Sequence, residues 1–211
     1  MSDKSRKKLA WAKNLKDKHN PNDDKKTPQP LAKKLIDMTP LKANDTVLDG
    51  FAGDDAFYAQ YPKNVHKHWC EIKRGVDFFT HKTKVDWVGP TNPPYSKINE
   101  VFKHSIQIAN KGIAFLIGIM NITPKRLHML ESGGFGITHM HIAQVTGWFG
   151  KSLYIVAQKN KSSILTYDPV SYRMPPDEDT EYKKKMKTYQ EKYYKQNFKE
   201  KMKAFRKSQK K

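Results

Sequence analysis

The uninterrupted apolar run at residues 113–119, IAFLIGI, constrains the fold of this chain more than any other stretch. Successive side chains of a β-strand point to opposite faces of the sheet, so a strand that is apolar at every position must be covered on both faces. Such strands occur in proteins whose helices pack on both sides of a mostly parallel sheet. We therefore expect Ile113–Ile119 to be a strand of an α/β sheet that is buried on both faces.

Segments typical of strands and helices alternate along residues 27–160. Short runs rich in apolar and β-branched residues predict strands at Thr46–Asp49, Val65–Cys70, Val76–Phe79, Val85–Val88, Ile113–Ile119, Ile137–Val145 and Leu153–Gln158. Helical spacing of apolar residues, with capping or proline signals, predicts helices at Thr27–Met38, Asp54–Tyr61, Lys97–Asn110 and Pro124–Glu131. This alternation is typical of an open α/β sheet. The last two strands have no helix between them, which predicts an antiparallel pair at one edge.

The chain is strongly basic, with 40 Lys and Arg against 21 Asp and Glu among its 211 residues. Residues 1–26 hold nine basic residues against four acidic ones, and residues 178–211 hold thirteen against five. This balance favours a polyanionic partner, and nucleic acid is favoured over a membrane because no lipid-anchor signal accompanies it. Solvated ends without a partner are the alternative interpretation.

Cysteine content and hydropathy limit the class of protein. A single cysteine, Cys70, excludes an intramolecular disulfide and a zinc ribbon, and we expect no metal site. The first twenty residues contain no apolar segment of a signal peptide, and no run approaches the ~18 apolar residues of a membrane span. We expect an intracellular protein, cytoplasmic or, in a eukaryotic cell, nuclear, with no membrane association.

Composition divides the chain into four parts. A basic extension covers residues 1–26, the folded domain residues 27–160, a proline-containing loop residues 161–177, and a basic, helical tail residues 178–211. Apolar residues of the tail follow a helical stripe: Tyr182, Met186, Tyr189, Tyr193, Phe198, Met202 and Phe205. The stripe favours docking on the domain or on a protein partner, while the surrounding lysines favour phosphate contacts without base readout.

Polar residues and turns lie at the carboxyl ends of the predicted strands, which is where open α/β sheets bind ligands. Gly53 would let a ligand approach the backbone beside a helix N-terminus. Glu71 could accept hydrogen bonds from two ribose hydroxyls, and Asp77 could accept from an adenine amino group while Ile72, Val76 or Phe78 packs on the ring. Taken singly, these residues have ordinary alternatives: a strand-to-helix turn, a solvated glutamate and a local backbone cap.

The tetrapeptide Asn92-Pro93-Pro94-Tyr95 follows the predicted strand Val85–Val88. The prolines fix φ and carry no N–H donor, so the turn presents backbone carbonyl groups as acceptors. Asn92 can accept through its side-chain oxygen, and Tyr95 can stack on a flat ring. On its own the stretch is a turn, but its place beside the other strand-end residues predicts a site for a planar amino group.

The stretches TPQPLAKKLI, VLDGFAG, the acidic Glu71, GVDFF and TNPPYS together resemble the successive motifs of class I S-adenosylmethionine-dependent amino-methyltransferases. They are most similar to the DNA adenine-N6 methyltransferases, over roughly residues 27–158. The resemblance implies a Rossmann-like methyltransferase fold, S-adenosyl-L-methionine as cofactor and DNA, ahead of RNA, as substrate. Too little chain follows the domain for a separate recognition domain, which implies short or relaxed sequence specificity.

The resemblance also implies roles for individual residues. It assigns the cofactor to Thr27, Pro28, Asp49, Phe51, Gly53, Glu71, Ile72, Asp77 and Phe78. It assigns catalysis to the tetrapeptide, in which Asn92 and Pro93 hold the target amino group and Tyr95 stacks on the base. Two positions depart from the family pattern, because Gly50 replaces a proline and Asp55 replaces the last glycine of the cofactor motif.

Three other functions stay open at this point. An RNA adenine methyltransferase would have the same motifs, and a protein-glutamine methyltransferase would use the same Asn-Pro-Pro-Tyr arrangement on an amide nitrogen. Asp55 also leaves room for a non-catalytic, nucleic-acid-binding subunit with the same fold, since it brings a side chain and a negative charge to the cofactor turn.

Overall fold

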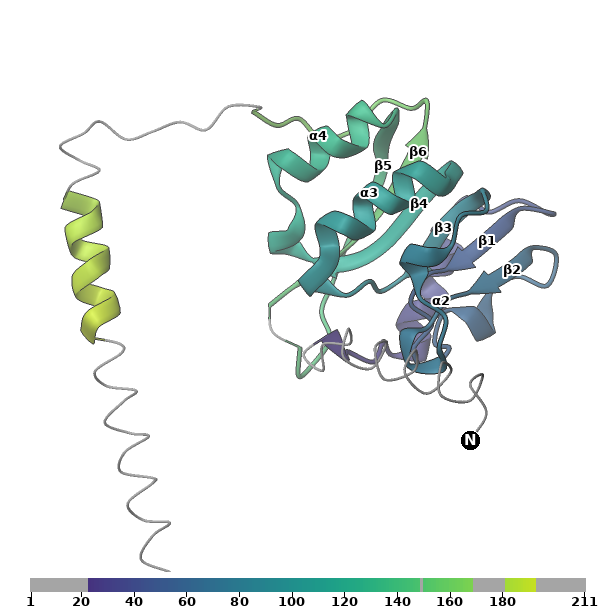
Figure 1. Ribbon diagram of the computed structural model, residues 1–211, viewed down its shortest axis with the longest axis horizontal. Helices are drawn as coiled ribbons and strands as arrows, with labels where there is room; N and C mark the ends of the chain where they lie inside the picture. Colours follow the sequence, from purple (N-terminus) through teal and green to yellow (C-terminus); the bar gives the residue numbers. More distant parts are fainter. Residues whose placement is uncertain (1–22, 149, 169–180, 193–211) are drawn as a thin grey trace, which may run out of the picture. The chain divides into compact units, whose positions relative to one another are not determined.

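Strand β4 (Ala109–Gly118) is an inner strand of a six-stranded sheet in the computed structural model (Figure 1). The structure describes residues 23–148, 150–168 and 181–192, in two units, Met1–Pro169 and Val170–Lys211. Ile113, Phe115 and Ile117 belong to one hydrophobic cluster, and Ala114 and Leu116 belong to the other. The apolar run is therefore buried on both faces, as predicted, except that Ile119 lies beyond the end of the strand.

The sheet has the order β2-β1-β3-β4-β6-β5. Its other strands are β1 (Thr46–Asp49), β2 (His66–Trp69), β3 (Val85–Thr91), β5 (Phe135–Ala143) and β6 (Ser152–Lys159). Strands β1 to β4 pair in parallel, while β6 is antiparallel to both β4 and β5. The predicted open α/β sheet of Rossmann-like type with an antiparallel edge is confirmed. Its strand order reverses direction between β1 and β3, which is where sheets of this kind bind ligands.

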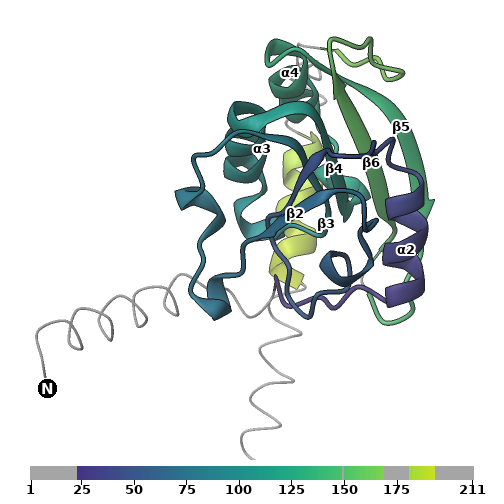
Figure 2. The same cartoon turned by 90° about the vertical axis from the view of Figure 1, so that its right-hand side faces the viewer.

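Helices cover both faces of the sheet. Helices α3 (Ile98–Ile108) and α4 (Pro124–Ser132) lie on one face and α2 (Gln29–Asp37) on the other, as the two views in Figures 1 and 2 show. The buried residues of α3 and α4 belong to the first cluster and those of α2 to the second. This three-layer arrangement leaves the carboxyl ends of β1 and β3 open to a ligand.

Two predicted elements are wrong. No α-helix spans Asp54–Tyr61, which forms turns and a short 3₁₀ helix, Tyr58–Gln60. Asp55 has a φ of 63°, which an α-helix cannot include, and Pro62 follows the segment. The strand predicted at Val76–Phe79 is also absent, since Phe78–Thr80 is a 3₁₀ helix that the Asp77 side chain caps through the Phe79 N–H.

Two element boundaries differ in ways that affect the site. β3 extends to Thr91, three residues beyond its predicted end, so Asn92 directly follows the strand. Thr27 does not cap α2, whose N-cap is Pro28, without a side-chain hydrogen bond. The Thr27 hydroxyl instead accepts a hydrogen bond from Asn92, at 3.3 Å. The capping signal at Thr27 was therefore misread.

The second unit is described over residues 181–192, which form a helix. Tyr182, Met186 and Tyr189 lie at helical spacing on it and are exposed. The rest of the predicted stripe, from Tyr193 onward, lies outside the described residues. Among the helices that the structure describes, none is long and apolar enough to span a membrane.

Candidate functional site

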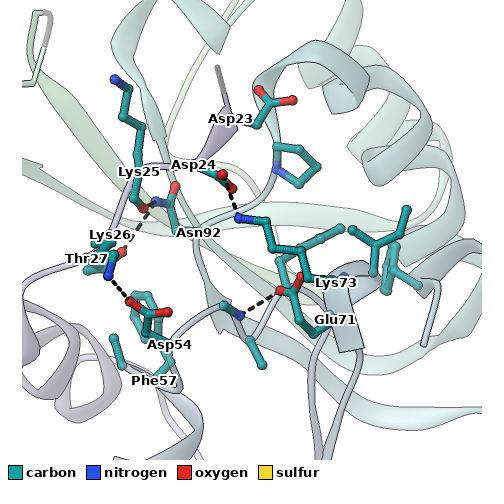
Figure 3. A pocket seen from close by; sticks show the side chains of 18 of the residues that line it. Asp23, Asp24, Lys25, Lys26, Thr27, Asp54, Phe57, Glu71, Lys73 and Asn92 are labelled. Atoms are coloured by element: carbon teal, nitrogen blue, oxygen red, sulfur yellow. Dashed lines mark hydrogen bonds and ion pairs between the residues drawn. The ribbon is translucent and has the colours of Figure 1, made fainter. Parts of the chain in front are cut away.

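A pocket of about 680 Å³ lies at the carboxyl ends of β1, β2 and β3 (Figure 3). Its wall comes from four segments of the chain, residues 23–29, 50–57, 71–79 and 92–97. Nine of the thirteen predicted site residues line it: Thr27, Phe51, Gly53, Glu71, Ile72, Asp77, Phe78, Asn92 and Pro94. The other four, Pro28, Asp49, Pro93 and Tyr95, are not among its lining residues. The fold therefore gathers the predicted cofactor residues and the start of the Asn-Pro-Pro-Tyr stretch around one cavity.

The Glu71 carboxylate holds the turn after β1. Glu71 accepts hydrogen bonds from the Gly53 N–H at 2.8 Å and from the Lys73 N–H at 2.9 Å. Gly53 has a φ of +52°, and a Cβ built on it would meet nothing closer than the Phe51 carbonyl oxygen at 4.0 Å. The space beside Gly53 therefore belongs to the pocket. Each Glu71 oxygen keeps a lone pair with which it could accept a further hydrogen bond.

Asp49 is fully buried at the end of β1 and precedes the lining residues Gly50–Asp54. Its Oδ1 accepts from the Thr91 hydroxyl at 2.6 Å and from the Phe51 N–H at 3.2 Å. It thus joins the turn that holds Gly53 to the strand that leads into Asn92. Its Oδ2 has no hydrogen-bond partner among the described residues, and burial raises the pKa of this carboxyl to about 7.

Asp55 is turned toward Arg74 and is not among the residues that line the pocket. The guanidinium donates to both carboxylate oxygens, at 2.8 and 3.2 Å, and to the Gly53 carbonyl oxygen at 3.3 Å. The Arg74 guanidinium also lies over the Trp69 ring, 4.4 Å from its centroid. The negative charge that Asp55 brings to this turn is therefore paired by a residue that itself lines the pocket.

Aromatic residues form the apolar part of the wall. The rings of Phe51 and Phe78 lie 4.7 Å apart between centroids, and Ile72 lines the cavity with them. A Cβ on Gly50 would come within 2.7 Å of the buried Phe78 ring. With Phe78 packed in this way, position 50 has no room for a side chain.

The segment Asp23–Thr27 joins the other parts of the wall, as the dashed contacts in Figure 3 show. Lys26 pairs with Asp54 and Asp24 pairs with Lys73, each at 2.6 Å. Asp23 accepts hydrogen bonds from Ser96. These ion pairs tie the segment to the turn after β1 and to the 3₁₀ turn Ile72–Arg74.

Asn92 is oriented by the same segment. Its side-chain N–H₂ donates to the Lys25 carbonyl oxygen at 3.1 Å and to the Thr27 hydroxyl at 3.3 Å. A carbonyl oxygen can only accept, so the amide nitrogen must face Lys25 and the amide oxygen must face the other way. The amide oxygen is then available as an acceptor, which is the role predicted for Asn92.

Tyr95 is half-buried beside β4. Burial raises the pKa of its hydroxyl to about 12, an effect that the nearby Gly118 backbone and Ser152 side chain partly offset. The ring also packs against the first hydrophobic cluster. Tyr95 is thus fixed at the carboxyl edge of the sheet, next to the end of β4.

Several residues of the wall were missed from the sequence. Asp23, Asp24, Lys26, Lys73 and Arg74 line the pocket, although residues 23–26 were assigned to an extension outside the domain. The sequence signals these residues only as acidic and basic side chains on either side of the cofactor motifs. Charge alone does not show which of them form ion pairs, such as Asp24 with Lys73, 49 positions apart.

Comparison with models of known protein families finds no match, and neither does comparison with curated protein sequences. Solved structures with similarity include the precorrin-6y C5,15-methyltransferase of Geobacter metallireducens GS-15, with 14% identity over 64% of this chain and 90% of that one, and a TM-score of 0.48. Magnesium protoporphyrin IX methyltransferase of Synechocystis PCC 6803 with bound SAM has 11% identity over 62% of this chain and 76% of that one, with a TM-score of 0.46.

A third similar structure is the tRNA m1G37 methyltransferase of M. jannaschii, with 14% identity and a TM-score of 0.46. The match covers 65% of this chain and 52% of that one. Similarity at this level carries no inference about activity or substrate, and the function must be argued from the site itself.

Proposed function

We propose that this chain is an S-adenosylmethionine-dependent methyltransferase that methylates the exocyclic amino group of adenine in DNA, with short or relaxed sequence specificity. The observation that carries the proposal is the position of Asn92 and Pro94. They follow β3 directly and line the same pocket as Gly53 and Glu71, at the reversal of strand order. The proposed acceptor for the amino group, Asn92, therefore lines a cavity that suits a nucleoside.

The residues of the pocket fit S-adenosylmethionine. A cavity of about 680 Å³ is in the size range of small-molecule sites. Phe51, Ile72 and Phe78 offer an apolar slot for adenine, with Asp77 beside it, and Glu71 offers acceptors for ribose hydroxyls. The described lining residues include acidic and basic side chains in equal number, five of each, which suits a ligand end that carries both an ammonium and a carboxylate. When bound, the cofactor supplies an electrophilic methyl group on sulfur.

The protein contributes to catalysis by orienting the amino nitrogen. An aromatic amine is a weak nucleophile because its lone pair is delocalised into the ring. Asn92 Oδ1 and the Pro93 carbonyl oxygen each accept a hydrogen bond from one N–H of the target amino group. This arrangement favours a pyramidal nitrogen with an exposed lone pair. Acceptors that are already in place lower the barrier without a strong general base.

A base inside a duplex must leave the stack before it can reach this site. Tyr95 is proposed to stack on the extruded base, and packing of its ring against the first hydrophobic cluster would hold it in place for that contact. The basic ends of the chain supply the attraction for phosphates, so binding is expected to weaken steeply with salt.

The pairing of Asp55 with Arg74 supports an active enzyme over a degenerate one, because the Arg74 guanidinium neutralises the added charge and Asp55 itself does not line the pocket. The test offers labelled cofactor together with DNA, RNA or protein, followed by mass analysis of nucleosides and peptides. We expect label in N6-methyladenine from DNA. Label in RNA adenine or in glutamine would redirect the proposal to that substrate, and no label with any substrate would support the non-catalytic alternative.

A further inference from the structure

The turn Ile119–Asn121, which follows β4, presents apolar side chains to solvent. Met120 is 85% exposed and Ile119 is 41% exposed. Single exposed apolar residues are common on protein surfaces, so exposure alone says little. Two further features distinguish this turn, its rigid attachment and its position beside the proposed site.

The turn is braced from three directions. The Ile119 N–H donates to the Lys151 carbonyl oxygen at 3.0 Å, and the Ile122 N–H donates back to the Ile119 carbonyl oxygen at 3.1 Å. Arg126 donates to the Asn121 carbonyl and side-chain oxygens at 2.8 and 3.2 Å. The same guanidinium donates to the Asn99 side chain at 2.9 Å, which anchors the turn to α3. Met120 therefore projects from a fixed backbone.

The turn lies next to the Asn92–Tyr95 stretch. β3 and β4 are neighbouring parallel strands, so their carboxyl ends meet at the same edge of the sheet. A Cβ on Gly118, the residue before the turn, would lie 3.4 Å from the Tyr95 ring. Exposed apolar side chains thus stand beside the residue proposed to stack on the target base.

The surroundings of the turn carry excess positive charge. The segments beside it, residues 95–100, 121–127 and 150–152, contain Lys97, Lys125, Arg126 and Lys151 against the single acid Glu100, and Arg126 and the Lys151 backbone hydrogen-bond the turn itself. An apolar tip within a basic surface matches the form of a nucleic-acid duplex, which is anionic outside and apolar between its base pairs.

We propose that the Ile119–Met120 tip is a wedge that inserts between base pairs of duplex DNA beside the target adenine. This inference rests on the proposed function and adds the means by which the base leaves the stack. Proteins that unstack base steps use side chains such as Met and Ile for this purpose. The flexible methionine side chain fills the space between the separated base pairs, and the braced turn holds it in place while the duplex is distorted.

The test compares Met120→Ala with the wild type on one oligonucleotide sequence, offered as a duplex and as a single strand. A single strand has no base pair to open, so a wedge matters only on the duplex. We expect Met120→Ala to lower kcat/KM on the duplex about tenfold more than on the single strand. Ile164→Ala is the matched control. Ile164 is 62% exposed and follows β6, and its N–H donates to Ile137 near the start of β5, at the edge of the sheet opposite the Ile119–Asn121 turn.

A second readout does not depend on methyl transfer. With 2-aminopurine at the target position, binding of the wild-type protein should raise fluorescence as the base unstacks, and Met120→Ala should raise it much less at equal occupancy. The wedge would be overturned if Met120→Ala lost the same activity on the duplex as on the single strand, or if it raised the fluorescence as much as the wild type does. If the wild type transfers no methyl group yet unstacks the base, the proposed function fails while the wedge stands.

Discussion

Asn92 shows how a single side chain is set by residues distant in sequence. Its N–H₂ group is held by Lys25 and Thr27, which lie more than sixty positions earlier. The sequence predicts Asn92 as the acceptor, because an amide oxygen followed by two prolines is suited to that role. It does not predict that Lys25 and Thr27 orient the amide, because those contacts form only when the chain folds.

Replacing Thr27 tests this orientation. Thr27→Val keeps the shape of the side chain but removes the hydroxyl that accepts from Asn92, so one contact worth about 1 kcal/mol is lost. We expect kcat to fall about fivefold, and Thr27→Ser to retain most of the activity. Steady-state kinetics at saturating cofactor measures the effect. Equal activity of the valine and serine variants would show that the hydroxyl does not position Asn92.

Asp49 links the stability of the fold to pH. Because its folded-state pKa is raised from 3.8 to about 7, the native state retains a proton that the unfolded state loses between pH 4 and 7. The contribution of this group is therefore fully present below pH 4 and is lost as pH rises to 7. Asn cannot ionise and keeps the acceptor for Thr91.

We accordingly expect the unfolding free energy of Asp49→Asn, relative to wild type, to improve by on the order of 2 kcal/mol between pH 5 and pH 8. Urea unfolding of both proteins at the two pH values measures the difference. A difference that does not change with pH would mean that Asp49 is ionised in the folded protein throughout this range.

At the scale of elements, the sheet was more predictable than the loops that form the site. The continuous apolar run of β4 predicts burial on both faces directly, and the helical spacing of apolar residues in α3 is an equally local signal. The segment after Gly53 was mispredicted because the left-handed backbone of Asp55 coincides with its pairing to Arg74, nineteen positions away. Local spacing carries no information about such a contact.

The segment Asp23–Thr27 gives a prediction at this scale. Asp24→Lys should weaken cofactor binding about threefold, because it breaks the pair with Lys73 and detaches the segment from the wall; partly exposed pairs of this kind contribute below about 1 kcal/mol. The double swap Asp24→Lys with Lys73→Asp should restore most of the affinity. Calorimetric titration with S-adenosylmethionine measures both variants.

Lys33→Ala serves as the control for this titration, since it removes the pair with Asp37 on α2, and neither residue lines the pocket. If the double swap binds no better than the single variants, the ion pair does not hold the segment in place.

At the scale of the whole molecule, charge is distributed unevenly along the chain. Residues 178–211 carry thirteen basic residues against five acidic ones, and the described helix at 181–192 exposes several of these lysines. Phosphate contacts by such a tail would provide affinity without sequence information. This agrees with the proposal of short or relaxed specificity.

Deletion of residues 178–211 should weaken binding to DNA and reduce the slope of log affinity against log salt concentration, since each lost phosphate contact lowers the slope by about 0.9. Fluorescence anisotropy over a range of salt concentrations measures the slope. Methyl transfer to a saturating oligonucleotide at low salt should persist. An unchanged slope would assign the phosphate contacts to other basic residues of the chain.

The central claim is that Asn92 presents an adenine amino group to the cofactor in this pocket. The most direct measurement is the rate of N6-methyladenine formation in DNA, by nucleoside mass analysis, for wild type and Asn92→Ala at saturating cofactor. We predict a fall of at least about a hundredfold in the variant, comparable to the loss of one preorganised hydrogen bond in an active site, with cofactor affinity nearly unchanged. Undiminished methylation by Asn92→Ala, or methyl groups found on cytosine instead of adenine, would contradict the claim.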